Sequence, residues 1–306
     1  MIKKELLGEY QNGNYSVKIY SDGTKIRETD DNKFVAAFPE SMDLKITNMC
    51  DVGCSFCHEK SVPNGKHGDM LNLEFINTLH PYTEVAIGGG DPMAYPYIVT
   101  FLQNLKIRHI IANMTVHHSS FLENRMLIDQ LIRNRLIWGL GVSVIDPTEE
   151  FMSAISGYEN AVVHVINGVM PIENLRKMYD RNIKVLILGY KQFGRGKEYY
   201  CEETIKNMAD MDKELPTALK HFAVLSFDNK AVQQLRAKRL VSAEEWKEHF
   251  MGEDGFYTMY IDAVERKFAK NSTSEARGDL LDNIDDMFLA VKNYTLYKTP
   301  YKTSIW

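Results

Sequence analysis

Cysteine is scarce in this sequence, with 4 cysteines among 306 residues. Cys50, Cys54 and Cys57 lie within one short segment, and Cys201 stands far from them. Such a set is a poor disulfide framework, because neighbours at this spacing would close strained loops and one thiol would be left over. The scarcity argues against a disulfide-stapled fold. The clustering indicates that the thiols bind metal or take part in catalysis.

Long apolar runs and a strong excess of one charge are also missing. No stretch approaches the roughly 18 apolar residues of a membrane span, and the first residues, MIKKELLGEY, lack the apolar core of a signal peptide. We therefore expect a cytoplasmic protein with no membrane partner. The formal net charge of -5 at pH 7 argues against nucleic acid as a partner, because binding to phosphates needs an excess of basic residues.

The chain is long enough for one large core with smaller units added to it. Residues 1–40 contain short alternating runs separated by the turns QNGN and SDGT, which predicts a small N-terminal β-meander. Residues 229–306 are expected to form a C-terminal α+β accessory unit or lid, with one short strand between two helices.

Between these units, in residues 41–228, short apolar runs alternate with amphipathic stretches of helical length. A crossover between parallel strands needs about a dozen residues, so this order predicts a parallel sheet with helices outside it. The predicted fold is α/β, a partial (β/α)6-type barrel. Its strands are expected at 43–47, 84–88, 110–116, 138–145, 161–166, 184–190 and 222–227.

The three clustered cysteines have the spacing Cx3Cx2C and directly follow the first strand of the predicted barrel. Ligands bind at this carboxyl-end loop in βα folds, and Gly53 allows a turn tight enough for the thiolates to converge. Three hypotheses are open. The first is a disulfide, which a reducing compartment disfavours. The second is a structural zinc site that includes His58, although zinc ligands usually come as two separated pairs. The third is a [4Fe–4S] cluster on three thiolates with one open iron.

This motif, with Phe56 directly before its last cysteine, resembles that of the radical S-adenosylmethionine (radical SAM) enzymes. At the end of the second strand, GGGDP (residues 88–92) is similar to the family's Gly-Gly-Glu-Pro element, with aspartate in place of the commoner glutamate. Glycines allow a ligand to approach the backbone closely, and a carboxylate can bind an ammonium group. The resemblance covers about residues 43–227. It implies cluster ligands at the three cysteines and cofactor contacts at Phe56, Gly89, Gly90 and Asp91.

Weaker matches follow on later strands. Ser143 lies where the family often places a polar residue against the ribose, and Ile166 lies where it presents backbone to the adenine. Alternation along the third strand puts Asn113, Thr115 and His117 on one face. A polar face on a central strand is costly unless it lines a wet cavity. We therefore expect these three side chains inside the barrel, in contact with cofactor or substrate.

The sequence assigns no catalytic residue but offers three candidates. Cys201 is a candidate hydrogen donor to a substrate radical, although a lone cysteine is more often a small buried hydrophobe. Tyr190 and Lys191 lie just past the sixth strand, and each is equally well explained as a polar group that has a partner within the fold.

The resemblance implies an oxygen-sensitive enzyme whose cofactors are a [4Fe–4S] cluster and S-adenosylmethionine. The open iron would bind the amino and carboxylate groups of S-adenosylmethionine. One electron from an external donor such as flavodoxin or ferredoxin would then release a 5′-deoxyadenosyl radical that abstracts a substrate hydrogen.

The segment MGEDGFYTMYID is faintly similar to the SPASM and twitch extensions of peptide-modifying relatives, but it has no cysteine for a second cluster. The expected substrate is therefore a peptide or protein side chain. A small metabolite or nucleoside is the first alternative. A non-enzymatic structural zinc protein is the second.

Overall fold

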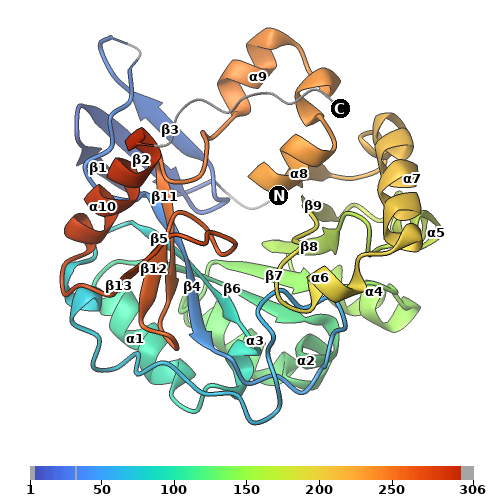
Figure 1. The fold of residues 1–306 in the computed structure, drawn as a ribbon, viewed down its shortest axis with the longest axis horizontal. Coiled ribbons are helices and arrows are strands. Elements are labelled where there is room, and N and C mark those ends of the chain that lie inside the picture. Colours follow the sequence, from blue (N-terminus) through green and yellow to red (C-terminus); the bar gives the residue numbers. More distant parts are fainter. Residues whose placement is uncertain (1–3, 32, 298–306) are drawn as a thin grey trace.

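The computed structural model describes residues 4–31 and 33–297, so residues 298–306, the end of the predicted accessory unit, lie outside the described residues. The described strands form one three-stranded and one ten-stranded sheet (Figure 1). The small sheet has the order β1-β2-β3 and is antiparallel. Its strands are β1 (Leu6–Asn12), β2 (Tyr15–Tyr20) and β3 (Lys25–Glu28), which is the expected β-meander.

Seven strands of the large sheet are parallel and follow one another in chain order. This confirms the predicted α/β class, and every expected strand is found to within a few residues. The strands are β4 (Ser41–Thr47), β5 (Glu84–Gly89), β6 (Ile111–His117), β7 (Gly139–Ser143), β8 (Ala161–Ile166), β9 (Lys184–Leu188) and β10 (Val224–Phe227).

The helices between these strands lie around the outside of the curved sheet (Figure 1). They bury apolar faces against it, as α1 does with Phe101, Leu102 and Leu105. None of the described helices is both long enough and apolar enough to cross a lipid bilayer. The helices are α1 (Ile98–Ile107), α2 (His118–Glu123), α3 (Arg125–Arg133), α4 (Glu149–Ile155), α5 (Ile172–Arg176), α6 (Gly196–Tyr199) and α7 (Glu202–Ala218).

Residues 71–80 form one of the amphipathic stretches of helical length between the strands, but the structure has only the 3-10 turn η1 (Glu74–Thr78) there. The Thr78 hydroxyl donates to the carbonyl of Phe75 at 2.8 Å. Threonine and asparagine side chains compete in this way with the backbone bonds of a helix, and the segment also contains Asn72 and Asn77.

The C-terminal region continues the large sheet. Strand β11 (Thr258–Asp262) pairs in parallel with β4, and β12 (Lys267–Ala269) and β13 (Arg277–Asp279) add antiparallel strands beyond it. The region also contains α8 (Asn229–Gln234), the 3-10 turn η3 (Ala237–Leu240), α9 (Ala243–His249) and α10 (Ile284–Tyr297). Its α+β character is confirmed, but its strands share the barrel's sheet. The domain boundaries near residues 40 and 228 stay predictions.

The sheet order runs from β10 through β4 to β13, and no pairing among the described strands closes it. The gap lies between the two edge strands, β10 and β13, and side chains near it connect the segments that follow β10 and β12. Asp254, just before β11, accepts hydrogen bonds from Asn229 at the start of α8 (2.7 Å) and from Asn271 after β12 (2.8 Å). The barrel is therefore partial, as predicted.

The small sheet covers the amino end of the barrel through a buried ionic cluster. Glu40, which directly precedes β4, is fully buried and accepts hydrogen bonds from the Tyr15 hydroxyl (2.6 Å) and from Arg27 Nε (2.8 Å). Lys25 lies 2.6 Å from Glu84 at the start of β5 and 3.7 Å from Glu40. These contacts leave the carboxyl ends of the strands as the end of the barrel where a ligand can bind.

We predict that Glu40→Gln lowers the free energy of unfolding by about 3 kcal/mol, because losing one partner of a buried ion pair leaves the other charge uncompensated. Urea denaturation measures this change. The control is Glu28→Gln, which removes an exposed ion pair with Lys18 and should cost less than about 1 kcal/mol. An equal decrease in the free energy of unfolding of the two variants would contradict the prediction.

Candidate functional site

The three clustered cysteines lie on one irregular segment, residues 48–62, called the cysteine loop below, which follows β4. All three are half-buried free thiols. Burial raises the pKa of the Cys50 and Cys54 thiols, and nearby negative charge raises both further, from Asp91 and Cys57 at Cys50 and from Cys57 and Cys50 at Cys54. The thiols therefore lie within electrostatic reach of one another. Within residues 4–31 and 33–297, however, no group of three or more His, Cys, Asp or Glu side chains is arranged to hold a metal ion.

The glycine motif is joined to the cysteine loop by its backbone. The amides of Gly90 and Asp91 donate to the carbonyls of Thr47 and Met49, both at 2.7 Å. A Cβ at Gly90 would lie 2.2 Å from the Met49 carbonyl oxygen. Gly89 has a φ of +110°, and a Cβ there would lie 2.5 Å from the Thr47 oxygen. Only glycine fits this approach, so the motif sets where the cysteine loop begins.

The Asp91 carboxylate is oriented by two hydrogen bonds. One oxygen accepts from the Met93 amide at 3.0 Å and caps the 3-10 turn η2 (Pro92–Ala94), and the other accepts from the Ser120 hydroxyl at 2.7 Å. Each carboxylate oxygen has a second lone pair, so both can still accept a bond from a ligand's ammonium group.

Arg195 fixes the far side of the cysteine loop. Its amide donates to the Cys57 carbonyl at 3.0 Å, and its guanidinium donates to the carbonyls of Cys54 (3.0 Å) and Ser61 (2.9 Å). Gly194, with a φ of +57°, lets this segment approach the loop, because a Cβ there would lie 2.2 Å from the His58 oxygen. The Phe56 ring packs edge-on against the Tyr199 ring of α6, with 5.7 Å between the ring centres.

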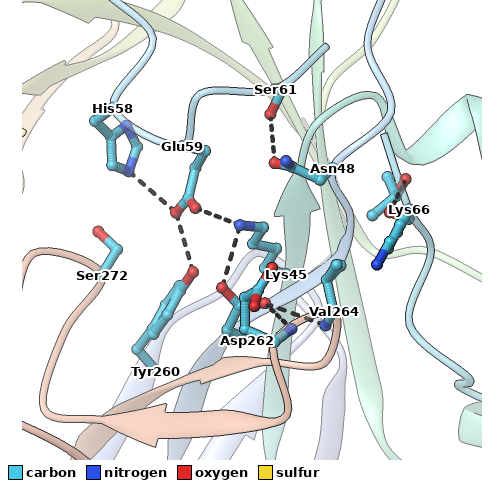
Figure 2. A network of polar contacts seen from close by, with 12 residues as sticks. Lys45, Asn48, His58, Glu59, Ser61, Lys66, Tyr260, Asp262, Val264 and Ser272 are labelled. Carbon is cyan, nitrogen blue, oxygen red and sulfur yellow. Dashed lines mark hydrogen bonds and ion pairs between the residues drawn. The ribbon is translucent and has the colours of Figure 1, made fainter. Parts of the chain in front are cut away.

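Charged side chains from distant segments meet beside the loop (Figure 2). Lys45 of β4 has only 6% of its side chain exposed and lies between Glu59 (2.8 Å) and Asp262 of β11 (3.1 Å). The Tyr260 hydroxyl donates to Glu59 at 3.0 Å. Burial alone would raise the pKa of Glu59, but a hydrogen bond from His58 and the Lys45 ammonium outweigh it and hold that pKa well below its usual range.

Further along the sheet, Asn113, Thr115 and His117 are half-buried, and the residues between them are fully buried. The three side chains do not converge on one point. Asn113 donates to Glu84 at 3.4 Å, toward the amino end, whereas His117 lies at the carboxyl end and its Nδ1 is 2.8 Å from the Ser119 hydroxyl.

Thr115 and His164 of β8 lie against the same glycine of β7. A Cβ at Gly141 would be 2.7 Å from Thr115 Oγ1 and 2.4 Å from the His164 ring. Ser143 and Ile166 end β7 and β8, so both lie at the same end of the sheet as the cysteine loop. Contacts of these residues with a cofactor stay predictions.

The three catalytic candidates have different environments. Tyr190 is buried, and its hydroxyl donates to the Gly196 carbonyl at 2.6 Å. Cys201 is exposed, caps α7, and has its pKa lowered by hydrogen bonds from the backbone and hydroxyl of Thr204 and the backbone of Glu203. Lys191 is the candidate that reaches the charged network, 2.9 Å from the Ser272 hydroxyl and 3.4 Å from His58 Nε2.

Sequence reasoning missed the residues that hold the loop. Arg195 stands between two glycines in FGRGK after the sixth strand, a signal that was available. Lys45 offered a second signal, because it is a charged residue within a predicted barrel strand, and burying a charge there is costly unless it has a partner. No local sequence signal could have found Tyr260 and Asp262, because they reach the site only through the pairing of β11 with β4.

No family model and no curated protein matches the sequence. Solved structures do match, among them three of SuiB from Streptococcus suis. SuiB bound to its precursor peptide SuiA gives a TM-score of 0.61 at 13% identity, over 88% of this chain and 69% of that one. SuiB bound to S-adenosylmethionine gives a TM-score of 0.57 at 14% identity, and the match covers 87% of this chain and 67% of that one. A third SuiB structure gives a TM-score of 0.52 at 11% identity, and the match covers 80% of this chain and 64% of that one.

At such low identity the likeness concerns the fold alone. The chain shares the fold of SuiB. The match extends over most of the described chain and about two thirds of the SuiB chain.

We predict that Gly90→Ala lowers the free energy of unfolding by about 1–3 kcal/mol, because the added methyl group forces the cysteine loop away from β5. Gly88→Ala is the control, since a Cβ at Gly88 meets nothing within 4 Å. Urea denaturation of both variants without cofactor makes the comparison. A Gly90→Ala protein as stable as Gly88→Ala would contradict the close approach.

Burial lowers the pKa of His164 from 6.5 to about 4. The unfolded chain therefore binds a proton here more readily than the folded chain, and stability falls as the pH drops from about 6.5 toward 4. We predict that the wild type loses roughly 2 kcal/mol more than His164→Gln between pH 7 and pH 5. Urea titrations at both pH values test this. His249→Gln, at an exposed histidine, should behave as the wild type, and an equal acid response in all three proteins would refute the prediction.

Proposed function

We propose that this protein is a radical SAM enzyme that acts on a peptide or protein side chain. The observation that carries the proposal is the backbone bonding between residues 47–49 and residues 90–91. It unites the two motifs of the resemblance, the cysteine loop and GGGDP, into one unit at the carboxyl ends of neighbouring strands, where ligands of βα folds bind.

The donor types on the cysteine loop fit the implied cluster, although the three thiols are not arranged as a metal site in the part of the chain that the structure describes. Three free thiols share one loop, as a cluster with one open iron requires. In the proposed site Cys50, Cys54 and Cys57 hold the [4Fe–4S] cluster, Gly89, Gly90 and Asp91 hold the amino end of S-adenosylmethionine, and Phe56, Ser143 and Ile166 line the rest of that cofactor. When bound and reduced by an external donor such as flavodoxin or ferredoxin, the cluster supplies the electron that converts S-adenosylmethionine to methionine and a 5′-deoxyadenosyl radical.

The chain's own part is to orient the reactants and to exclude water. Arg195 and the glycine motif hold the backbone on the two sides of the cysteine loop, so the position of the loop would be set before the cofactor binds. The small sheet covers the amino end of the barrel. A substrate would then enter from the carboxyl end of the barrel. An oxygen-sensitive site of this kind also favours a reducing, cytoplasmic location.

The substrate class is supported by the fold likeness to SuiB bound to a precursor peptide, which extends over 88% of this chain. The alternatives are a small metabolite or nucleoside, and a structural zinc protein. Isothermal calorimetry that compares the binding of short peptides with that of nucleosides separates a peptide substrate from a small metabolite or nucleoside. Purified protein that contains zinc but no acid-labile sulfide would favour the structural zinc protein.

The first test is anaerobic iron–sulfur reconstitution, reduction with dithionite in the presence of S-adenosylmethionine, and chromatography for 5′-deoxyadenosine. The wild type is expected to form it, and Cys54→Ala to form none and to bind less iron, because a ligand thiolate is missing. Cys201→Ala is the matched control and should load as much iron as the wild type, since its thiol is exposed at the start of α7. Zinc binding without 5′-deoxyadenosine in the wild type would refute the proposed function.

A further inference from the structure

Glu59 connects the cysteine loop to strands that lie about two hundred residues later in the chain. It stands two residues after Cys57, and 11% of its side chain is exposed. One carboxylate oxygen lies 2.8 Å from Lys45 Nζ, and the other accepts from the Tyr260 hydroxyl at 3.0 Å and lies 3.3 Å from His58 Nε2 (Figure 2). The end of the cysteine loop is thus held by β4 and β11 together.

Asp262 extends this connection into the turn between β11 and β12. One oxygen lies 3.1 Å from Lys45 Nζ and 3.7 Å from Arg277 of β13. The other accepts from the amides of Val264 (3.1 Å) and Glu265 (2.9 Å). Only 2% of the Asp262 side chain is exposed, so the turn holds it in place and it in turn fixes Lys45.

A second connection runs through the segment after β12. Lys191 lies 2.9 Å from the Ser272 hydroxyl and 3.4 Å from His58 Nε2. Arg277 donates to the Ser272 carbonyl at 2.6 Å, and its guanidinium lies 5.3 Å from the centre of the Tyr260 ring. Both connections end on residues that directly follow Cys57.

The energetics favour one closed arrangement. Lys45 is a buried cation with two carboxylate partners, and each carboxylate has further donors from β11 or its turn. A buried charged group that loses a partner is strongly destabilised, so the network resists displacement of any member. The cysteine loop contains no helix or strand longer than an isolated bridge, and its position depends on such contacts.

We propose that β11–β13 form a positioning element for the cysteine loop, with Tyr260 and Asp262 acting through Glu59 and Lys45. The region therefore serves the cofactor end of the barrel although it has no cysteine of its own. The part of this inference that concerns the cluster rests on the proposed function. The coupling between loop and strands does not.

The test compares Tyr260→Phe and Asp262→Asn with Tyr257→Phe. Tyr257 directly precedes β11, and its hydroxyl contacts the Phe34 carbonyl (3.4 Å), away from the network. Hydrogen–deuterium exchange of the cluster-free protein is followed in residues 54–62 and in β6. We expect exchange in residues 54–62 to rise on the order of tenfold in the first two variants, because a hydrogen bond to a charged group is lost. Tyr257→Phe should leave it unchanged, and β6 should be unaffected in all three.

Unchanged exchange in residues 54–62 of both network variants would overturn the proposal. So would an equal rise in β6, which would mean general loss of stability. Tyr260→Phe keeps the ring and removes one hydroxyl, so it decides the matter if Asp262→Asn does not fold.

A second measurement addresses the cluster. After reconstitution, loss of iron to a ferrous chelator should be faster in Tyr260→Phe and Asp262→Asn than in Tyr257→Phe, and equal rates would overturn the role toward the cluster. If the wild type takes up no iron, the proposed function fails, while the exchange comparison still decides whether the strands position the loop.

Discussion

The carbonyls of Thr47 and Met49 accept hydrogen bonds from the amides of Gly90 and Asp91, and the rest of the site is built around this contact. It brings the chain that leaves β4 against the chain that leaves β5, with no room for a side chain between them. The cysteine loop therefore starts from a fixed place, and Arg195 holds its other side. A loop without regular structure is in this way defined at both ends by backbone carbonyls.

Charge provides the second constraint. Buried charges would ordinarily be costly, and here Lys25 and Lys45 are each paired with two carboxylates and Arg27 with one. Lys25 and Arg27 share Glu40 at the amino end, and Lys45 is shared by Glu59 and Asp262 near the carboxyl end. The two ionic clusters have different roles. The cluster around Glu40 attaches the small sheet to the amino end of the barrel, and the cluster around Lys45 contacts the cysteine loop.

The sequence was a good guide to the parallel strands, because each is a short apolar run followed by a helix-length stretch, and both signals are local. It located the cysteine loop and the glycine motif for the same reason. It was a poor guide to the C-terminal region. Strand β11 was expected as part of a separate unit, whereas pairing with β4 brings Tyr260 and Asp262 to the site. That pairing joins residues far apart in the chain, and no periodicity within either segment encodes it.

The place of β11 beside β4 also has a consequence for synthesis on the ribosome. Strand β4 is the first of the large sheet to be made, and one of its two edges finds its partner only when residues 258–262 emerge. For about two hundred residues of translation, that edge presents the unpaired amides and carbonyls of a strand that is mostly buried in the folded protein, which is a template for pairing with another chain. A nascent chain of this fold therefore depends, until its last strands appear, on whatever shields that edge.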